Sequence, residues 1–333
     1  MRNELRPLAR IWDEHDRFLI LTHERPDGDA FGASLGLLSF LLDNGKRAEL
    51  LLPEPVPPAY KLFMPVGNAN IKTALSIEEL SSYSLCLSVD NANTKRAALG
   101  PAGLALDNFP IPLINIDHHP DNQNFGAENF VCPDCAASAE IIYETSRFLS
   151  HWRISSHTAT LLLLGLVMDT GSFRFDNTSP ALLHSAAELL AHGADHHLIV
   201  EKMFFSKPVS ILRFESELMN RFLRIDCGGR YAYCRLDAEL AGRHGVDLRH
   251  TEGLIDLLRG LDGVIVAALF LQRPEGVKIS LRSKDPKYPV APIARRFSGG
   301  GHELAAGGII QGASMEEAEQ KLLVEIRALL DSD

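Results

Sequence analysis

Residues 111–119 read IPLINIDHH, an apolar run that ends in one aspartate and two histidines. A short apolar run beside a turn-forming proline is typical of a strand buried on both faces. The strand predicted over residues 111–116 therefore places Asp117, His118 and His119 directly beyond its carboxyl end. The chain repeats this order of a buried strand followed by side chains able to bind a metal ion. The repetition is what decides the fold.

Two further stretches have the same order. Residues 18–22 (FLILT) are followed by His23 and an Asp-Gly-Asp turn over 27–29, and residues 84–89 (SLCLSV) are followed by Asp90. Strands that alternate with helices predict an α/β domain with a parallel sheet and helices on both faces. The other predicted elements are a strand at residues 47–52 and helices at residues 30–44, 77–83, 139–149, 156–168 and 180–192.

The pattern changes after a predicted connecting helix at residues 208–224. Residues 272–276 (QRPEG) have the composition of a hairpin turn between two strands. A final helix is expected to begin at Ser314, because Glu317 three residues later completes a capping box. The predicted strands of this part lie at residues 231–236, 264–271 and 277–282.

These patterns divide the 333 residues into two domains, each long enough to bury a core. We expect the first domain over residues 1–195 and a linker helix region over residues 196–225. A second, smaller α/β domain is expected over residues 226–333.

The net charge of the chain indicates which classes of binding partner to expect. With 33 Lys and Arg against 43 Asp and Glu, the formal net charge is −10. Proteins that follow a long polyanion depend on basic excess, so we expect no long duplex nucleic acid as a partner. The charged N-terminus has no apolar signal core, and the longest apolar run, residues 161–168, is far shorter than the ~20 residues of a membrane span. We therefore expect a cytoplasmic protein without a membrane partner; a homodimer remains an open alternative.

Five cysteines, an odd number, make a disulfide framework unexpected in such a chain. Cys132 and Cys135 form one CxxC pair, and no second pair follows to complete a tetrahedral zinc site. We expect these two residues to be plain loop thiols. Cys86, Cys227 and Cys234 lie in apolar runs typical of strands, and we expect them in the core.

The polar clusters indicate a metal centre. In an open parallel sheet, ligands bind just beyond the carboxyl ends of the strands, so residues far apart in sequence meet there. Each cluster alone could be an ordinary polar turn, but four of them at one sheet edge are hard to explain without a shared role. The candidate side chains are His23, Asp27, Asp29, Asp90, Asp117, His118, His119 and Asp169, the last at the end of an apolar helix.

The mixed nitrogen and oxygen set favours Mn²⁺, with Mg²⁺ or Co²⁺ as alternatives. Two ions about 3.5–4 Å apart can share a carboxylate and activate a water molecule as the nucleophile. The chain has no GxSxG elbow, HExxH motif or P-loop that would indicate another mechanism. The sequence therefore predicts a hydrolase with two divalent metal ions.

The four clusters resemble the four motifs of the DHH phosphoesterase superfamily, which is named after a triplet like that at residues 117–119. Residues 298–307 (SGGGHELAAG) resemble the GGGH–AAG signature of the DHHA1 domain, although Ser298 stands where many relatives carry glycine. Within the superfamily, the chain is most similar to the bacterial bifunctional oligoribonuclease and pAp phosphatase group. The resemblance implies a DHH catalytic domain followed by a DHHA1 substrate-binding domain.

The resemblance also implies roles for individual residues. One ion would be held by His23, Asp27 and Asp90, and the other by Asp29, Asp90, His118 and Asp169, so that Asp90 bridges the two. His119 would bind the scissile phosphate, and Asp117 would orient a neighbouring ligand. Substrate contacts in the second domain would come from Arg282, Gly299, Gly300, Gly301 and His302.

The expected reaction is hydrolysis of short oligoribonucleotides, including linear dinucleotides such as pApA and pGpG, to mononucleotides, with pAp as a further candidate substrate. The resemblance leaves the cleavage direction open. Three alternatives remain: a family II-like inorganic pyrophosphatase, a RecJ-like single-strand exonuclease, and a nucleotide sensor without catalysis. The GGGH segment argues against the pyrophosphatase, and the complete ligand set argues against the sensor.

Overall fold

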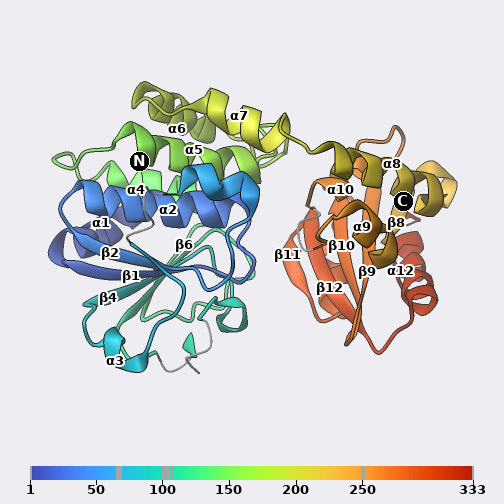
Figure 1. The fold of residues 1–333 in the computed structure, drawn as a ribbon, viewed down its shortest axis with the longest axis horizontal. Coiled ribbons are helices and arrows are strands. Elements are labelled where there is room, and N and C mark those ends of the chain that lie inside the picture. The colour runs from blue at the N-terminus through green and yellow to red at the C-terminus, as the bar shows by residue number, and fades with distance from the viewer. Residues whose placement is uncertain (1, 65–69, 100–104, 107–108, 249–251, 332–333) are drawn as a thin grey trace. The chain divides into compact units, whose positions relative to one another are not determined.

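The computed structural model describes residues 2–64, 70–99, 105–106, 109–248 and 252–331. The chain forms two compact units that divide between Ser206 and Lys207. Figure 1 shows the first unit in blue to yellow-green and the second in yellow to red. The helix α7 (His196–Phe204) belongs to the first unit and α8 (Val209–Phe222) to the second.

The first unit contains a six-stranded sheet in the order β3-β2-β1-β4-β5-β6. Every neighbouring pair in this sheet is parallel, which confirms the predicted parallel sheet. The apolar runs at residues 18–22, 84–89 and 111–116 form its central part, because strands buried on both faces need apolar side chains at most positions. The strands are β1 (Arg17–Leu21), β2 (Arg47–Leu51), β3 (Ile71–Lys72), β4 (Leu85–Val89), β5 (Leu113–Asp117) and β6 (Glu128–Val131).

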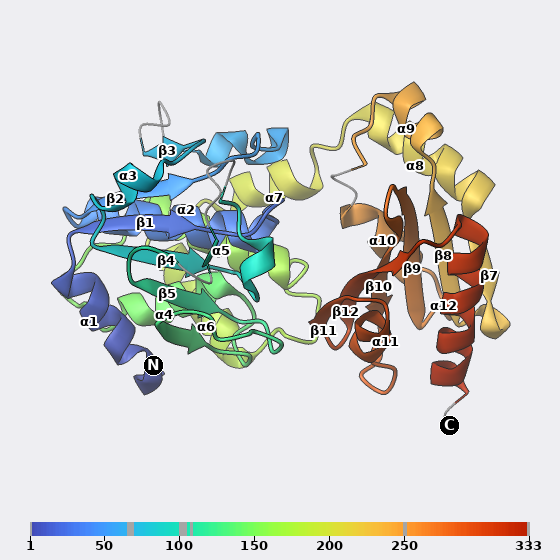
Figure 2. The ribbon, with the colours of Figure 1, turned by 90° about the horizontal axis from the view of Figure 1, so that it is seen from below.

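Helices cover the two faces of this sheet unequally, as Figures 1 and 2 show. The long helices α2 (Gly28–Asp43), α4 (Ser138–Ser146) and α5 (Ser156–Asp169) form the larger core with one face. A Cβ atom at Gly32 would lie 2.5 Å from the Gly165 backbone nitrogen, so α2 and α5 can approach this closely only with glycine there.

The other face carries a smaller core built around the alternate strand residues Leu19 and Leu21. The short helix α3 (Ile77–Leu80) contributes Leu80 to this core, and 3-10 turns and loops complete it. The remaining helices of the first unit are α1 (Arg6–Glu14) and α6 (Pro180–Ala191).

The second unit contains a six-stranded sheet in the order β11-β12-β10-β9-β8-β7. Only β8 and β9 pair in parallel. Leu281 packs into a core with one face and Leu269 into a core with the other. The strands are β7 (Arg224–Asp226), β8 (Tyr231–Leu236), β9 (Val266–Arg273), β10 (Gly276–Ser283), β11 (Gly300–His302) and β12 (Ala305–Gln311), and the remaining helices are α9 (Ala238–His244), α10 (Glu252–Arg259), α11 (Ala291–Arg296) and α12 (Met315–Leu330).

Two local predictions for this unit are confirmed. Arg273 pairs with Gly276, so a tight hairpin joins β9 to β10. Ser314 caps α12 and forms a reciprocal capping box with Glu317. One prediction is wrong: Cys227 does not lie in a core strand but in a 3-10 turn, where it is only partly buried and has φ 52°. The residues Asp226 and Gly228 that flank it favour a turn over a strand.

No helix among the described residues has the length and apolarity needed to cross a membrane.

Candidate metal centre

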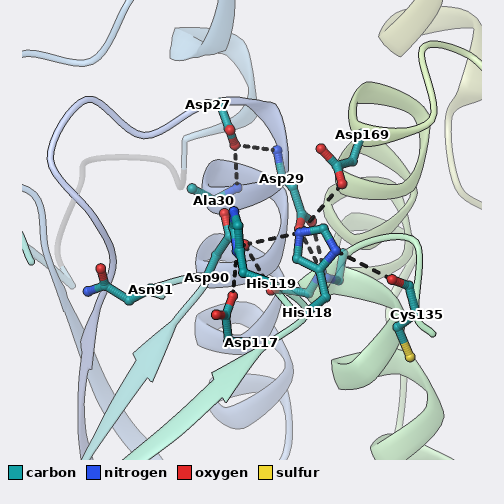
Figure 3. A network of polar contacts seen from close by, with 12 residues as sticks. Asp27, Asp29, Ala30, Asp90, Asn91, Asp117, His118, His119, Cys135 and Asp169 are labelled. Atoms are coloured by element: carbon teal, nitrogen blue, oxygen red, sulfur yellow. Dashed lines mark hydrogen bonds and ion pairs between the residues drawn. The ribbon is translucent and has the colours of Figure 1, made fainter. Parts of the chain in front are cut away.

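Strand ends and helix ends meet at one edge of the first sheet. The pairing of Leu21 with Ser88 and of Val89 with Ile116 brings the carboxyl ends of β1, β4 and β5 to the same level. Asp27 precedes the first residue of α2, and Asp169 is the last residue of α5. Figure 3 shows the carboxylates and imidazoles from these elements turned toward one another.

Three overlapping groups of potential ligand atoms lie here, each with its atoms within 4.8 Å of one another. Asp90 belongs to all three groups and is almost fully buried. The groups are His23, Asp27 and Asp90; Asp29, Asp90 and His118; and Asp90, Asp117 and His119. His118 also approaches Asp169, with 3.5 Å between Nε2 and Oδ2. The structure thus brings together all eight residues singled out from the sequence in the first domain.

The backbone at Asp90 is unusual and fixes the direction of its side chain. Asp90 has φ 58°, a left-handed conformation that few residues other than glycine adopt. Such conformations cost about 1–3 kcal/mol and persist at functional sites where the surrounding structure holds them. The Ser138 hydroxyl donates to Oδ1 of Asp90 over 2.9 Å, and Oδ2 lies 3.5 Å from Nε2 of His23. The two carboxylate oxygens therefore face opposite parts of the site.

The Nδ1 atoms of the three histidines are all within reach of oxygen acceptors. In His23, Nδ1 lies 2.8 Å from the carbonyl oxygen of Glu24, and in His118 it lies 3.4 Å from that of Cys135. In His119 it lies 2.8 Å from Oδ1 of Asp117. In His23 and His118, an Nδ1–H that donates to these oxygens leaves Nε2 to act as the ligand atom, which is the usual arrangement around metal-binding histidines.

Helix starts hold two of the aspartates. The side chain of Asp27 caps α2 by accepting from the backbone N–H groups of Asp29 and Ala30, both at 3.1 Å. The side chain of Asp29 accepts from the first N–H groups of α4, Ser138 at 2.6 Å and Ala139 at 3.1 Å. N–H groups at a helix start stabilise a carboxylate and fix its orientation.

The electrostatics of this cluster suit cations. Burial and the charges of neighbouring carboxylates, above all Asp90, raise the pKa of Asp29. Burial also raises the pKa of Asp169 to about 6. Burial works against ionisation of Asp90 as well, but its hydrogen bond with His23 and nearby imidazoles lower the pKa of this carboxyl. Carboxylates packed this closely repel one another, and a divalent cation with nitrogen and oxygen ligands would offset that repulsion.

Sequence reasoning missed two residues of the site. Ser138 contacts both Asp29 and Asp90, and Asn122 donates to Oδ2 of Asp117 over 2.5 Å. The same Asn122 amide also lies near the Asn91 carbonyl, at 3.1 Å. Neither a serine at a helix start nor an asparagine in a loop carries a signal in one sequence, because both residue types are common at such positions.

Asn122→Leu is expected to lower kcat by about 10–100-fold, because the Asp117 carboxylate would lose its donor and hold His119 less firmly. The pH dependence of kcat should shift as well, since Asp117 raises the pKa of His119, against the effect of burial, to about 10. Steady-state kinetics across pH would check both. Asn70→Leu is the control, because the Asn70 side chain donates to the Ala48 carbonyl, away from the site. Equal losses in the two variants would contradict the assignment.

In the second unit, Arg282 and His302 share one face of the sheet. Both pair directly with Ala305, from β10 and β11 on either side of β12, so their side chains point the same way about 9–10 Å apart. The adjacent residues Leu281 and Ala306 point into the core on the opposite face. The two polar side chains therefore lie on the face opposite α12.

The backbone structure itself requires glycine at some of the positions before His302. A Cβ atom at Gly299 would overlap the carbonyl oxygen of Gly307, and Gly301 has φ 129°. Gly300 pairs with Gly307 in the sheet. Close backbone approach thus accounts for two of the three glycines before any ligand is considered.

Comparison with protein families matches both units. The model of the DHH family N-terminal domain matches residues 17–166, and the model of the DHHA1 domain matches residues 228–332. One match falls within each of the two units found in the structure.

Individual relatives are similar along most of the chain. A bifunctional oligoribonuclease and PAP phosphatase from Thermus thermophilus is 31% identical over 92% of this chain and 88% of its own. A protein of the same name from Bacillus subtilis is 25% identical over 97% of each chain. The crystal structure of an exopolyphosphatase-related protein from Bacteroides fragilis shares the fold, with a TM-score of 0.83, 23% identity and coverage of 100% of this chain and 98% of the other.

Proposed function

The chain belongs to the DHH family of phosphoesterases, in the form that carries a DHHA1 domain, and we propose that it hydrolyses short oligoribonucleotides to mononucleotides and removes the 3′-phosphate of pAp. The observation that carries the proposal is the ligand cluster centred on Asp90. Relatives named for both activities are similar along nearly the whole chain, including the DHHA1 region.

Two divalent cations, Mn²⁺ in our proposal, complete the site. His23, Asp27 and Asp90 would hold one, and Asp29, Asp90, His118 and Asp169 the other. Mn²⁺ accepts both imidazole and carboxylate ligands, whereas Mg²⁺ prefers oxygen. The cations would supply Lewis acidity and lower the pKa of a water molecule, so that hydroxide forms near neutral pH.

The protein's own side chains position the reacting groups. Asp117 fixes the ring of His119 through the contact at Nδ1. The raised pKa of His119, about 10, favours the imidazolium, whose second N–H can donate to a non-bridging oxygen of the scissile phosphate. Charge-assisted bonds of this kind strengthen as negative charge builds up on the phosphoryl oxygens.

Arg282 and His302 would bind a second phosphate or the base and ribose of the substrate. Both lie on one sheet face, and the guanidinium group of Arg282 can grip a phosphate through two N–H groups. A recognition surface of two side chains suits a short substrate better than a polymer.

His302→Ala is expected to raise KM for dinucleotides by about tenfold and to change kcat by less than about threefold, because a bond made equally in ground and transition states affects binding alone. Steady-state kinetics with pApA would measure both constants. Lys278→Ala is the matched control, since Lys278 is an exposed cation on β10 four residues before Arg282. An unchanged KM for His302→Ala, or an equal rise in the control, would contradict the role.

A panel of substrates tests the proposed function. Labelled RNAs from dinucleotides to long single strands, together with pGpG, pAp and pyrophosphate, would be incubated with Mn²⁺ or Mg²⁺. We expect the shortest RNAs and pAp to be consumed fastest in Mn²⁺. Intact dinucleotides and pAp would exclude the proposal. Faster release of phosphate from pyrophosphate would favour a pyrophosphatase, faster degradation of long strands a processive exonuclease, and binding without turnover a sensor.

A further inference from the structure

Cys132 and Cys135 lie in a turn that a disulfide could close. The turn follows β6, and the Cys135 backbone N–H donates to the Cys132 carbonyl over 2.9 Å. The first and fourth Cα atoms of such a turn lie less than about 7 Å apart, and disulfides span Cα separations of about 4.4–6.8 Å. Both residues are free thiols and are buried.

The two thiols are close enough to influence each other's ionisation. A hydrogen bond between the thiols lowers the pKa of Cys132 and raises that of Cys135, so the proton is retained on Cys135. The guanidinium group of Arg2 lies beside the turn, where it donates to the Asp134 carbonyl over 3.2 Å. Cys132 is therefore the better nucleophile and Cys135 the thiol that can resolve its oxidised form.

The segment 132–139 that contains this turn also supports the metal centre. Its first backbone N–H, that of Cys132, donates to the carbonyl oxygen of Asp117 over 2.9 Å. The Cys135 carbonyl lies 3.4 Å from Nδ1 of His118. Three residues later, Ser138 holds Asp29 and Asp90. A change in the turn is thus connected to the metal ligands through a few backbone bonds.

We propose that Cys132 and Cys135 form an oxidation site, at which a peroxide converts the pair to an intrachain disulfide and thereby weakens metal binding by His118. The Cys132 thiolate attacks one peroxide oxygen and releases hydroxide, leaving a sulfenic acid. The Cys135 thiol then attacks that sulfur, and water leaves as the S–S bond forms. In total, two thiols and one hydrogen peroxide give one disulfide and two waters.

The burial of Cys132 determines which oxidant we expect to react, and the geometry of the turn determines which contact we expect to be lost. Cys132 is 7% exposed, so we expect a molecule as small as hydrogen peroxide to reach it more readily than a bulky disulfide. The contact between His118 and Cys135, at 3.4 Å, is already at the limit of a hydrogen bond. An S–S bond restricts the separation and orientation of the two Cα atoms, so closing it would shift the backbone of the turn, the Cys135 carbonyl included. Loss of a partner behind a metal-binding histidine lowers metal affinity by about 10–100-fold.

The test combines chemical mapping with metal binding on the full-length protein. The protein would be treated with hydrogen peroxide, alkylated and digested, and peptides containing residues 132 and 135 would be weighed. We expect a peptide lighter by two hydrogens that dithiothreitol reverts. Calorimetric titration with Mn²⁺ should show about tenfold or greater loss of affinity in the oxidised protein, with recovery after reduction.

Matched variants separate this site from general oxidation. Cys135→Ser should abolish both the disulfide and the peroxide effect on Mn²⁺ affinity, and Cys132→Ala serves the same purpose if the first variant does not fold. Cys227→Ser, in the second unit, should behave as the unmodified protein. Absence of the 132–135 disulfide in peroxide-treated protein would overturn the proposal, as would a disulfide that leaves Mn²⁺ affinity unchanged. Mapping and titration need no substrate, so neither result depends on the proposed function.

Discussion

Replacing Asp90 by asparagine is expected to lower kcat for dinucleotide hydrolysis by about 10³-fold. Asp90 is the one residue shared by the three ligand groups described above at the edge of the first sheet. Its carboxylate oxygens face different neighbours, His23 on one side and His118 on the other. Losing the ligand shared by two cations removes several kcal/mol of transition-state stabilisation, and each 1.36 kcal/mol corresponds to about tenfold in rate.

The measurement is a single-turnover rate with saturating Mn²⁺ and dinucleotide, so that weaker binding does not imitate slower chemistry. Asp176→Asn is the control, because Asp176 is an exposed aspartate seven residues beyond Asp169. Circular dichroism would establish that both variants are folded. More than about a tenth of the unmodified rate in Asp90→Asn would disprove the bridging role, since the loss would then match that of an ordinary supporting residue.

The second large effect concerns stability. Mn²⁺ is expected to raise the melting temperature strongly, and to raise it more at pH 8 than at pH 5. A ligand that binds only the folded state at 100 times its Kd adds about 2.7 kcal/mol for each site to the free energy of unfolding. The carboxyl and imidazole ligands must be deprotonated to bind, so the gain grows as pH rises.

In the presence of EDTA, the opposite trend is expected. The folded pKa of Asp29 and that of Asp169, about 6, lie above the ~3.9 of an unfolded aspartate. The folded protein therefore binds more protons than the unfolded chain between these values, and the free energy of unfolding falls as pH rises above about 4. His23 and His119 act in the same direction, because interactions with Asp90 and Asp117 raise their pKa values despite burial, and that contribution is lost as pH rises above about 6.5.

Asp90 does not reverse this trend. Its folded pKa lies below the ~3.9 of the unfolded chain, so its contribution changes only below about pH 4. Calorimetric melting curves from pH 5 to pH 8, with EDTA and with Mn²⁺, would test both trends. In Asp90→Asn, the Mn²⁺-dependent rise should largely disappear. A melting temperature that does not respond to Mn²⁺, or a response that shrinks toward pH 8, would contradict a metal centre built from these side chains.

Much of the fold followed from local patterns. The runs that became β1, β4 and β5 are mostly apolar and almost fully buried, and few structures other than a strand covered on both faces require this. The capping box at Ser314 and the turn before Gly276 could also be predicted from the sequence, because both depend on residues a few positions apart. The edge strands β3 and β6 were not predicted, since they are short and not continuously apolar.

The amino-acid sequence alone determined which side chains can reach the site. Each candidate ligand of the first domain directly follows a strand or lies at a helix end, and the ends of parallel strands must meet at one edge of the sheet. Only the tertiary structure decided how these side chains are held. Asp29 receives its hydrogen bond from Ser138, 109 residues away, and Asn122 supports Asp117 from a loop. The physical reason is the distance along the chain over which each interaction acts. Hydrophobic periodicity and helix capping involve residues a few positions apart, so they can be recognised in the local sequence. A backbone N–H from a helix more than a hundred residues away cannot be recognised from the residues beside the aspartate that it orients.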